Sequence, residues 1–307
     1  MQRTREYEDF GPWTYRVTEP DDVPPLYRRH GIDLEAAHLV LKVPRPIERR
    51  DATPETHLYD HLVVAGKDAL TVLSRRGDTY QTVVVPYARI GAIHRSAAML
   101  EGRLVVRDVG GLELGGVAVD LRYNAVSRAV VAELVEVLRA QAIAARDPDE
   151  RPGRAPLPHE RMRDLGVADA GLVTAQHELV ERRPSLVLLG AHAATVVPRR
   201  GGRFRHFLDV HRPVTLQAAL VCGDAGSLEV LHRREWFTSH PRPAWSVVHT
   251  VVLTRAVTAV GSHPHPRYVG AYRVQVETGR ATVELAFPDG AESGAAIAGA
   301  LAGVRAI

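Results

Sequence analysis

The feature that most constrains the fold is a stretch of sequence that occurs twice. Residues 62–76 read LVVAGKDALTVLSRR and residues 220–234 read LVCGDAGSLEVLHRR, so seven of fifteen positions are identical without a gap. Each copy has two apolar runs around a short turn of small or charged residues, which is typical of paired strands. Self-similarity over such a distance is the signature of a repeated structural unit. The chain is therefore predicted to contain a duplicated β-rich module.

The similarity continues beyond the first fifteen residues. The segment 81–93 (QTVVVPYARIGAI) corresponds to 249–260 (HTVVLTRAVTAV), and two more strand-like stretches follow in each copy. The segment 125–140 then corresponds to 291–306. In its first copy, apolar residues recur at spacings of three and four, which predicts an amphipathic helix with Asn124 or Ser127 as N-cap.

A run of short strands closed by one helix predicts a small curved sheet or barrel with the helix across its open end. This order resembles the pleckstrin-homology-like (PH-like) superfamily, in particular its bacterial members. The matching residues are VVVPYARIGAI (83–93) and, in the second copy, VVLTRAVTAV (251–260). The resemblance implies a mainly β fold with α: two PH-like curved sheets or barrels, each closed by a C-terminal helix. It also implies a binding function, because this scaffold carries lipid, peptide and protein binders.

Composition sets the expected domain boundaries. The segment 145–164 holds four prolines and many charges without periodicity, which predicts a linker. Pro44 and Pro46 end a strand predicted at 38–43, and Pro184 ends a helix predicted at 168–182. The expected order is an N-terminal extended segment (1–56), a first PH-like module (57–144), the linker (145–164), a helix and hairpin insertion (165–212) and a second PH-like module (213–307).

The charge balance argues against nucleic acid as a partner. Basic and acidic residues number 39 and 36, whereas a nucleic-acid binder concentrates positive charge on one face. The N-terminus lacks the apolar core of a signal peptide, and the weakly polar stretch 185–197 is too short for a membrane-spanning helix. The single cysteine, Cys222, predicts a buried, inert thiol and no internal disulfide. The sequence thus predicts a soluble cytoplasmic protein.

No strong catalytic motif is present. The Gly-Lys pair at 66–67 is followed by Asp68 rather than by the Ser or Thr of a phosphate-binding loop. A near match to a zinc-protease helix at His177 lacks the second histidine one turn later. The segment SHPHPRY (262–268) offers two imidazoles and no further ligand, so a loop between strands is expected there. We predict no catalytic residue, no metal ligand and no cofactor.

The candidate binding residues are arginines. The densest basic stretch, PRRGGRFRHF (198–207), places guanidinium groups between aromatic rings, a pattern that can hold an anionic partner. The alternative is a tight hairpin at the two glycines, with the arginines facing water. The candidates in this stretch are Arg199, Arg200, Arg203 and Arg205.

The repeat supplies two further arginine pairs, Arg75 with Arg76 and Arg233 with Arg234. The PH-like resemblance places both pairs at the end of the second strand, beside a loop that contacts phosphorylated headgroups in members that bind lipid. The alternative is a charged turn at a strand end, because acidic residues follow both pairs closely.

Taken together, these patterns predict a non-enzymatic binding or scaffold protein with a protein or peptide partner. Two modules on one chain raise the effective affinity when both engage. Two alternatives remain: peripheral binding of anionic lipid headgroups, and an enzyme whose site lies between the modules. The oligomeric state and the partner stay open.

Overall fold

The computed structural model describes residues 7, 10–53, 55–111, 114–146, 165–201, 212–239, 246–301 and 305–306. In these residues the chain is mainly β with a few helices, which confirms the predicted class. The strands form four sheets, and every strand pair is antiparallel except the short pair β16–β19.

The first sheet has the order β1-β2-β3-β4-β5. The first copy of the repeat spans two of its strands, β3 and β4. Strand β2 lies in the predicted N-terminal segment and pairs with β3, so that segment contributes to the same sheet. The strands are β1 (Tyr15–Arg16), β2 (Leu39–Pro44), β3 (Tyr59–Ala65), β4 (Ala69–Arg76) and β5 (Thr79–Pro86), with short 3-10 helices at Pro20–Asp22, Pro25–His30 and Arg49–Asp51.

The second sheet combines strands from both halves of the chain, in the order β8-β7-β6-β15-β13-β12-β9. The second copy of the repeat spans β12 and β13. The halves join where β6 pairs with β15, from Ala98 opposite Ser246 to Ala92 opposite Val252. Its strands are β6 (Ile90–Ala98), β7 (Glu101–Asp108), β8 (Val117–Asn124), β9 (Val187–His192), β12 (Ala219–Gly223), β13 (Ser227–His232) and β15 (Ser246–Leu253).

The pairing of β6 with β15 contradicts the expectation of closed barrels. In the described residues no sheet closes on itself, and the prediction of two separate barrels is wrong in that detail. The physical reason is that a strand edge needs hydrogen-bond partners, and β6 finds them on β15 of the other half. The first half therefore extends its sheet into the second half instead of closing it.

Two smaller sheets complete the strand set. One has the order β18-β17-β16-β19, with β16 (Ala259–Pro264), β17 (Ala271–Thr278), β18 (Ala281–Pro288) and β19 (Arg305–Ala306). The other has the order β10-β11-β14, with β10 (Thr195–Val197), β11 (Val214–Leu216) and β14 (Phe237–Thr238).

The helices follow the predicted periodicity. Helix α2 (Arg128–Ala144) buries Val131, Leu134 and Leu138 on one side, and α3 (Ala170–Arg182) ends two residues before Pro184. The Asn124 side chain caps the short helical turn just ahead of α2 by accepting from the Val126 amide. Helix α5 (Glu292–Ala300) follows β18. Most of the predicted linker, 147–164, lies outside the described residues.

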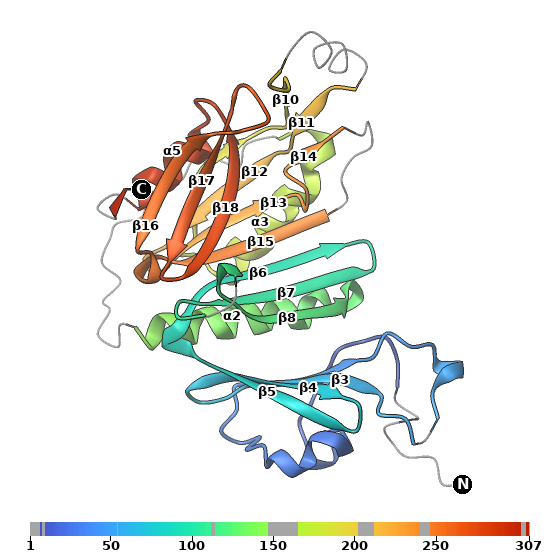
Figure 1. Ribbon diagram of the computed structural model, residues 1–307. Coiled ribbons are helices and arrows are strands. Elements are labelled where there is room, and N and C mark those ends of the chain that lie inside the picture. The colour runs from blue at the N-terminus through green and yellow to red at the C-terminus, as the bar shows by residue number, and fades with distance from the viewer. Residues whose placement is uncertain are drawn as a thin grey trace.

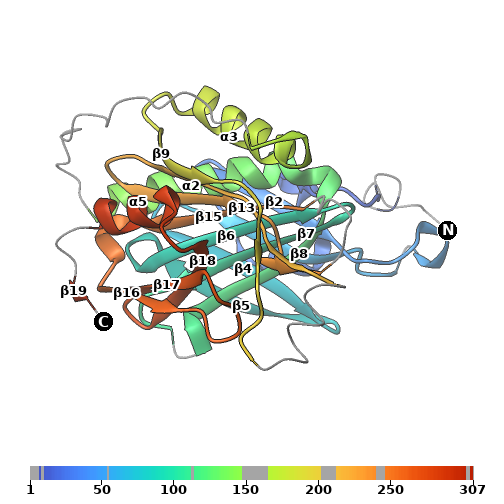
Figure 2. The same ribbon diagram turned by 90° about the horizontal axis from the view of Figure 1, so that it is seen from above.

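The seven-stranded sheet separates two hydrophobic cores. On one face, α2 packs with strands of the first sheet and with Val251 and Leu253 of β15, while α3 covers β12 and β13. On the opposite face, β16–β18 and α5 enclose a second core. Figures 1 and 2 show this layering, with α2 and α3 on one side of the sheet and β16–β18 on the other.

A buried ion cluster fixes α2 and α3 to the second half. Its centre is Glu229 on β13, which is fully buried. Its carboxylate accepts from Arg183 after α3 at 2.6 Å and from His249 of β15 at 2.7 Å. It also pairs with Nε of Arg139 on α2 at 3.0 Å. Buried charges of this kind are strongly destabilising when one partner is lost, so the cluster holds the elements in one arrangement.

Candidate functional site

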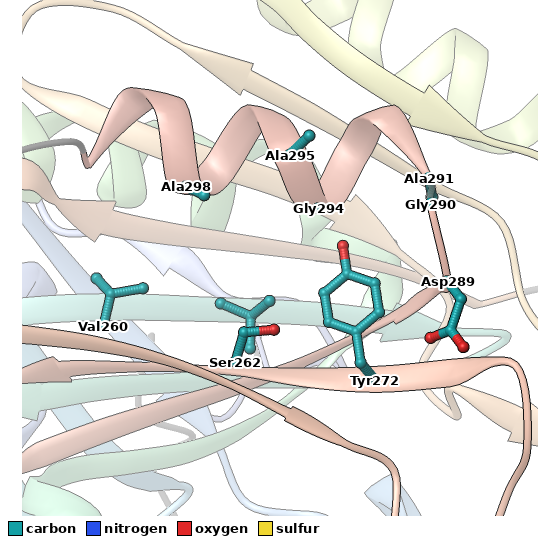
Figure 3. Close-up of a pocket in the computed structure, with 10 residues that line it drawn as sticks. Val260, Ser262, Tyr272, Asp289, Gly290, Ala291, Gly294, Ala295 and Ala298 are labelled. Carbon is teal, nitrogen blue, oxygen red and sulfur yellow. The ribbon is translucent and has the colours of Figure 1, made fainter. Parts of the chain in front are cut away.

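A cavity lies between α5 and the inner face of strands β16 and β17 (Figure 3). Its volume is about 420 Å³. The walls are mostly apolar, with a few polar groups at the mouth. The lining residues are Val260, Ser262, Tyr272, Val274, Asp289, Gly290, Ala291, Gly294, Ala295 and Ala298.

The cavity exists because the side chains of α5 are small. Gly294, Ala295 and Ala298 face it, whereas α2 fills the corresponding core of the first half with valine and leucine side chains. A Cβ on Gly294 would lie 1.5 Å from the Tyr272 hydroxyl, so only glycine lets this ring reach the helix. Figure 3 shows Tyr272 extending from β17 toward α5. Helix α5 therefore covers the sheet, but its small side chains do not fill the space between the helix and the strands.

The first turn of α5 is held firmly. The Nε2–H of His192 donates to the Gln217 carbonyl at 3.0 Å, and Nδ1 therefore accepts from the Ser293 hydroxyl at 2.7 Å. Burial lowers the pKa of His192 to about 4, which keeps this imidazole neutral. Gly190 of β9 allows a close approach, because a Cβ there would lie 2.9 Å from the Glu292 carbonyl oxygen. One wall of the cavity is thus rigidly placed.

Two polar groups mark one end of the cavity. Burial, with a smaller contribution from the Asp289 carboxylate, raises the pKa of Tyr272, so the phenol stays protonated and can donate. Asp289 follows β18, and Gly290 turns the chain toward α5 with a φ of +74°. The site combines an apolar interior with a hydroxyl and a carboxylate at its rim.

An open strand edge borders the same cavity. Strand β16 pairs with β17 along its whole length. Its other edge pairs with β19 in parallel, and only at Ala259 and Val260. Within the described chain, no strand pairs with the remaining edge from Gly261 to Pro264. Ser262 on this part of β16 also lines the cavity. Backbone donors and acceptors at an unpaired edge can receive another strand.

The four arginines of the repeated pairs lie in four different environments. Arg75 pairs with Asp60 at 2.8 Å, and Arg76 is exposed and donates to Gln81. Arg233 is buried; it pairs with Asp169 at 2.8 Å and donates to the carbonyls of Ala168 and Ser246. Arg234 is exposed and pairs with Glu101 at 3.2 Å. Arg233 thus anchors the start of α3 and does not face solvent.

Arg199 and Arg200 of the basic stretch contact the segment that joins β16 and β17. Arg199 forms an isolated bridge with Tyr268 and donates to the Arg212 carbonyl at 3.0 Å. Nε of Arg200 donates to the carbonyls of His265 and Tyr268. The predicted candidates Arg203 and Arg205 lie outside the described residues. These contacts differ from those of the two repeated arginine pairs.

The structure also shows where Cys222 and the segment 262–268 lie. Cys222 is buried, as predicted, and burial raises the pKa of its thiol to about 12. The segment 262–268 covers the end of β16 and the loop to β17. The described residues contain no group of three or more His, Cys, Asp or Glu that could hold a metal ion. In the same part of the chain, every helix is too short or too polar to cross a membrane.

No protein-family model matches this chain, and no curated protein matches it either. The cavity residues were not among the sequence candidates. In the repeat, Ala295 and Ala298 correspond to Ala129 and Ala132 of the first helical segment, so comparison of the two copies gives no signal for the cavity.

Proposed function

We propose that this protein is a non-enzymatic binding protein with two PH-like modules, and that the second module binds an extended peptide. The observation that carries the proposal is the open edge of β16 beside the cavity under α5. The chain's own β19 already pairs with this edge at Ala259 and Val260. A peptide would continue that mode of pairing along the rest of the strand.

The chemistry of the groove defines the peptide. Backbone hydrogen bonds to β16 supply affinity for any extended chain, and the pocket for one side chain supplies specificity. A cavity of about 420 Å³ with alanine and glycine walls accepts a large apolar side chain. The Asp289 carboxylate at the rim favours a lysine or arginine in the ligand next to that side chain.

The order of elements supports the PH-like part of the proposal. In the first half, β5 leads through a 3-10 turn (Tyr87–Arg89) to three strands and α2. In the second half, β15 leads through a 3-10 turn (Thr254–Ala256) to three strands and α5. The two copies of the repeated sequence occupy equivalent strand pairs in these series. Duplication of one module accounts for both the sequence pattern and this order.

The first module lacks the groove that the second module has. Its strand β6, which corresponds to β16, pairs with β15 along nearly its whole length. Its helix α2 fills the underlying core with Val131, Leu134 and Leu138. Peptide binding is therefore assigned to the second module, and the first module supports it through the shared sheet.

The test is selection of peptides from a displayed random library. Ala298 is exposed at the groove wall, so Ala298→Leu fills the cavity without disturbing the core. Ala129→Leu makes the same change at an exposed position of α2 and is the matched control. We expect peptides that bind the wild type and the control and that lose at least about tenfold in affinity for Ala298→Leu.

The same peptides test the strand-addition mode. N-methylation of alternate backbone amides removes hydrogen-bond donors and should abolish binding, while the free side chains remain. Selected peptides that bind Ala298→Leu as well as they bind the wild type would contradict the groove as the site. Failure to select any peptide would contradict the proposed function.

A further inference from the structure

The hairpin that joins β6 and β7 has an unusual two-residue loop, Met99-Leu100. The strands on either side pair up to Ala98 and Glu101. Met99 has a φ of +53° and is 86% exposed, and Leu100 is 67% exposed. Positive φ at this kind of loop favours glycine or asparagine, because a larger side chain is strained there. The loop thus combines backbone strain with two apolar side chains in water, and strain of this kind often marks a functional site.

Two more exposed apolar side chains lie at the same end of the molecule. The amide of Ala125 donates to the Leu100 carbonyl at 2.9 Å, which places Val126 beside the loop. The amide of Thr14 donates to the Ser127 hydroxyl at 2.8 Å, which brings Trp13 to the same place. Figure 1 shows the β6–β7 turn and the start of α2 at one end of the sheet. We call these four residues, Trp13, Met99, Leu100 and Val126, the apolar tip.

The exposed apolar side chains are clustered at this tip, and the base of its hairpin is tightly packed. The apolar tip holds four of the eight large hydrophobic side chains that are exposed in the described chain, so the exposure is not scattered at random. The ring of Tyr123 lies over Gly102, where a Cβ would be 2.3 Å from it, and the phenol donates to the Ser96 carbonyl at 3.1 Å. This packing fixes the base of the hairpin, so the tip is presented in one conformation.

Arginines surround the apolar tip. Three carboxylates at this end of the sheet and helix each pair with an arginine: Glu101 with Arg234, Asp120 with Arg103, and Glu133 with Arg16. The exposed Arg122 and Arg128 add positive charge beyond these pairs. The tip is therefore an apolar projection with a net positive rim.

The size of the tip distinguishes between kinds of partner. Four side chains expose on the order of a few hundred Å² of apolar surface, whereas a stable protein interface buries about 800 Å² on each partner. A lipid bilayer has no such minimum area, since each apolar side chain that enters it gains separately. Tryptophan is favoured at the membrane interface, and arginine is attracted to anionic lipid.

We propose that the apolar tip inserts into the headgroup region of an anionic lipid bilayer, with the surrounding arginines against the lipid phosphates. The protein then lies on the membrane through the first module. The groove under α5 belongs to the second module. Membrane docking and peptide binding are separate properties of the two modules.

The test is co-sedimentation with vesicles of phosphatidylcholine alone or mixed with phosphatidylserine. The test variant is Met99→Gly with Leu100→Asn, and Val196→Asn removes a comparably exposed apolar side chain on β10, outside the tip. We expect the wild type and the control to bind the mixed vesicles and the double variant to lose at least about tenfold in partitioning. Because glycine accepts positive φ, the double variant should unfold at a temperature no lower than that of the wild type.

Each other outcome overturns the proposal. Equal binding of the wild type and the double variant would show that the apolar tip is not the membrane contact. Equal binding to vesicles with and without phosphatidylserine would remove the role of the arginine rim. No binding to either vesicle, together with a wild-type dimer that the double variant converts to a monomer, would identify the tip as a contact between copies of this chain.

Discussion

Acid should destabilise this protein well above the pH at which carboxylates titrate. The relevant groups are two buried histidines, His192 beside Phe287 and His232 beside Trp236 of the second core. Burial lowers the pKa of His232 to about 3 and that of His192 to about 4. His232 stacks on Trp236, with ring centroids 4.1 Å apart, and its Nδ1 donates to the Arg233 carbonyl at 2.6 Å. Both imidazoles are therefore neutral in the folded protein at pH 5.

The magnitude follows from proton linkage. An unfolded histidine has a pKa near 6.5, so the unfolded chain takes up protons between pH 7 and pH 5 while these two folded-state imidazoles do not. The free energy of unfolding then falls by about 2 kcal/mol for each group over this range. The sum of about 4 kcal/mol is a large part of the stability of a typical domain. His94 on β6 has a pKa lowered to about 4 and acts in the same direction.

Urea unfolding at pH 7, 6 and 5 measures this effect. Because His232 stacks on Trp236, tryptophan fluorescence reports the local packing. The variant His192→Gln should lose stability at pH 7 but show a weaker pH dependence, since one titrating group is gone. His177→Gln is the control, because His177 is exposed on α3. A free energy of unfolding that changes by less than about 1 kcal/mol between pH 7 and pH 5 would refute the assignment of neutral buried imidazoles.

Three further predictions concern single positions, each measured by thermal or urea unfolding. Gly294→Ala should destabilise the fold by about 1–3 kcal/mol through overpacking, whereas Gly299→Ala, which meets no atom within 4 Å, should not; equal effects would contradict the close ring contact. Glu229→Ala should cost about 3–5 kcal/mol because it leaves buried arginines without their carboxylate, and the exposed Glu284→Ala less than about 1 kcal/mol. Met99→Gly should stabilise the hairpin by about 0.5–1 kcal/mol; a loss of stability would argue against strain at that residue.

Local pattern in the sequence predicts most of the elements. The repeat and its alternation locate strands β3, β4, β12 and β13, and the spacing of Val131, Leu134 and Leu138 locates α2. These features depend on neighbours along the chain, so one sequence is enough to find them. The ends of the elements also follow local rules, as at Pro44 and Pro184.

Such local patterns do not predict which strands far apart in the sequence pair with each other. Strand β6 alternates in the same way whether it closes its own module or pairs with β15, so the sequence does not distinguish a barrel from a shared sheet. The burial of Arg233 depends on Asp169, which is 64 residues away, and a charged turn gives no hint of that contact. The cavity under α5 likewise depends on how far the helix stands from β16 and β17. Candidate sites built from charge alone therefore missed it.

The shared sheet has a consequence for how this chain is made. When the first half emerges during synthesis, the edge of β6 has no partner until β15 follows about 150 residues later. Meanwhile the β15 of a neighbouring chain presents the same hydrogen-bonding edge, so two nascent molecules can exchange halves and trap a domain-swapped dimer. Slow or crowded synthesis would increase that exchange. The β6–β15 pairing that joins the two halves is therefore also a point at which the chain can misassemble.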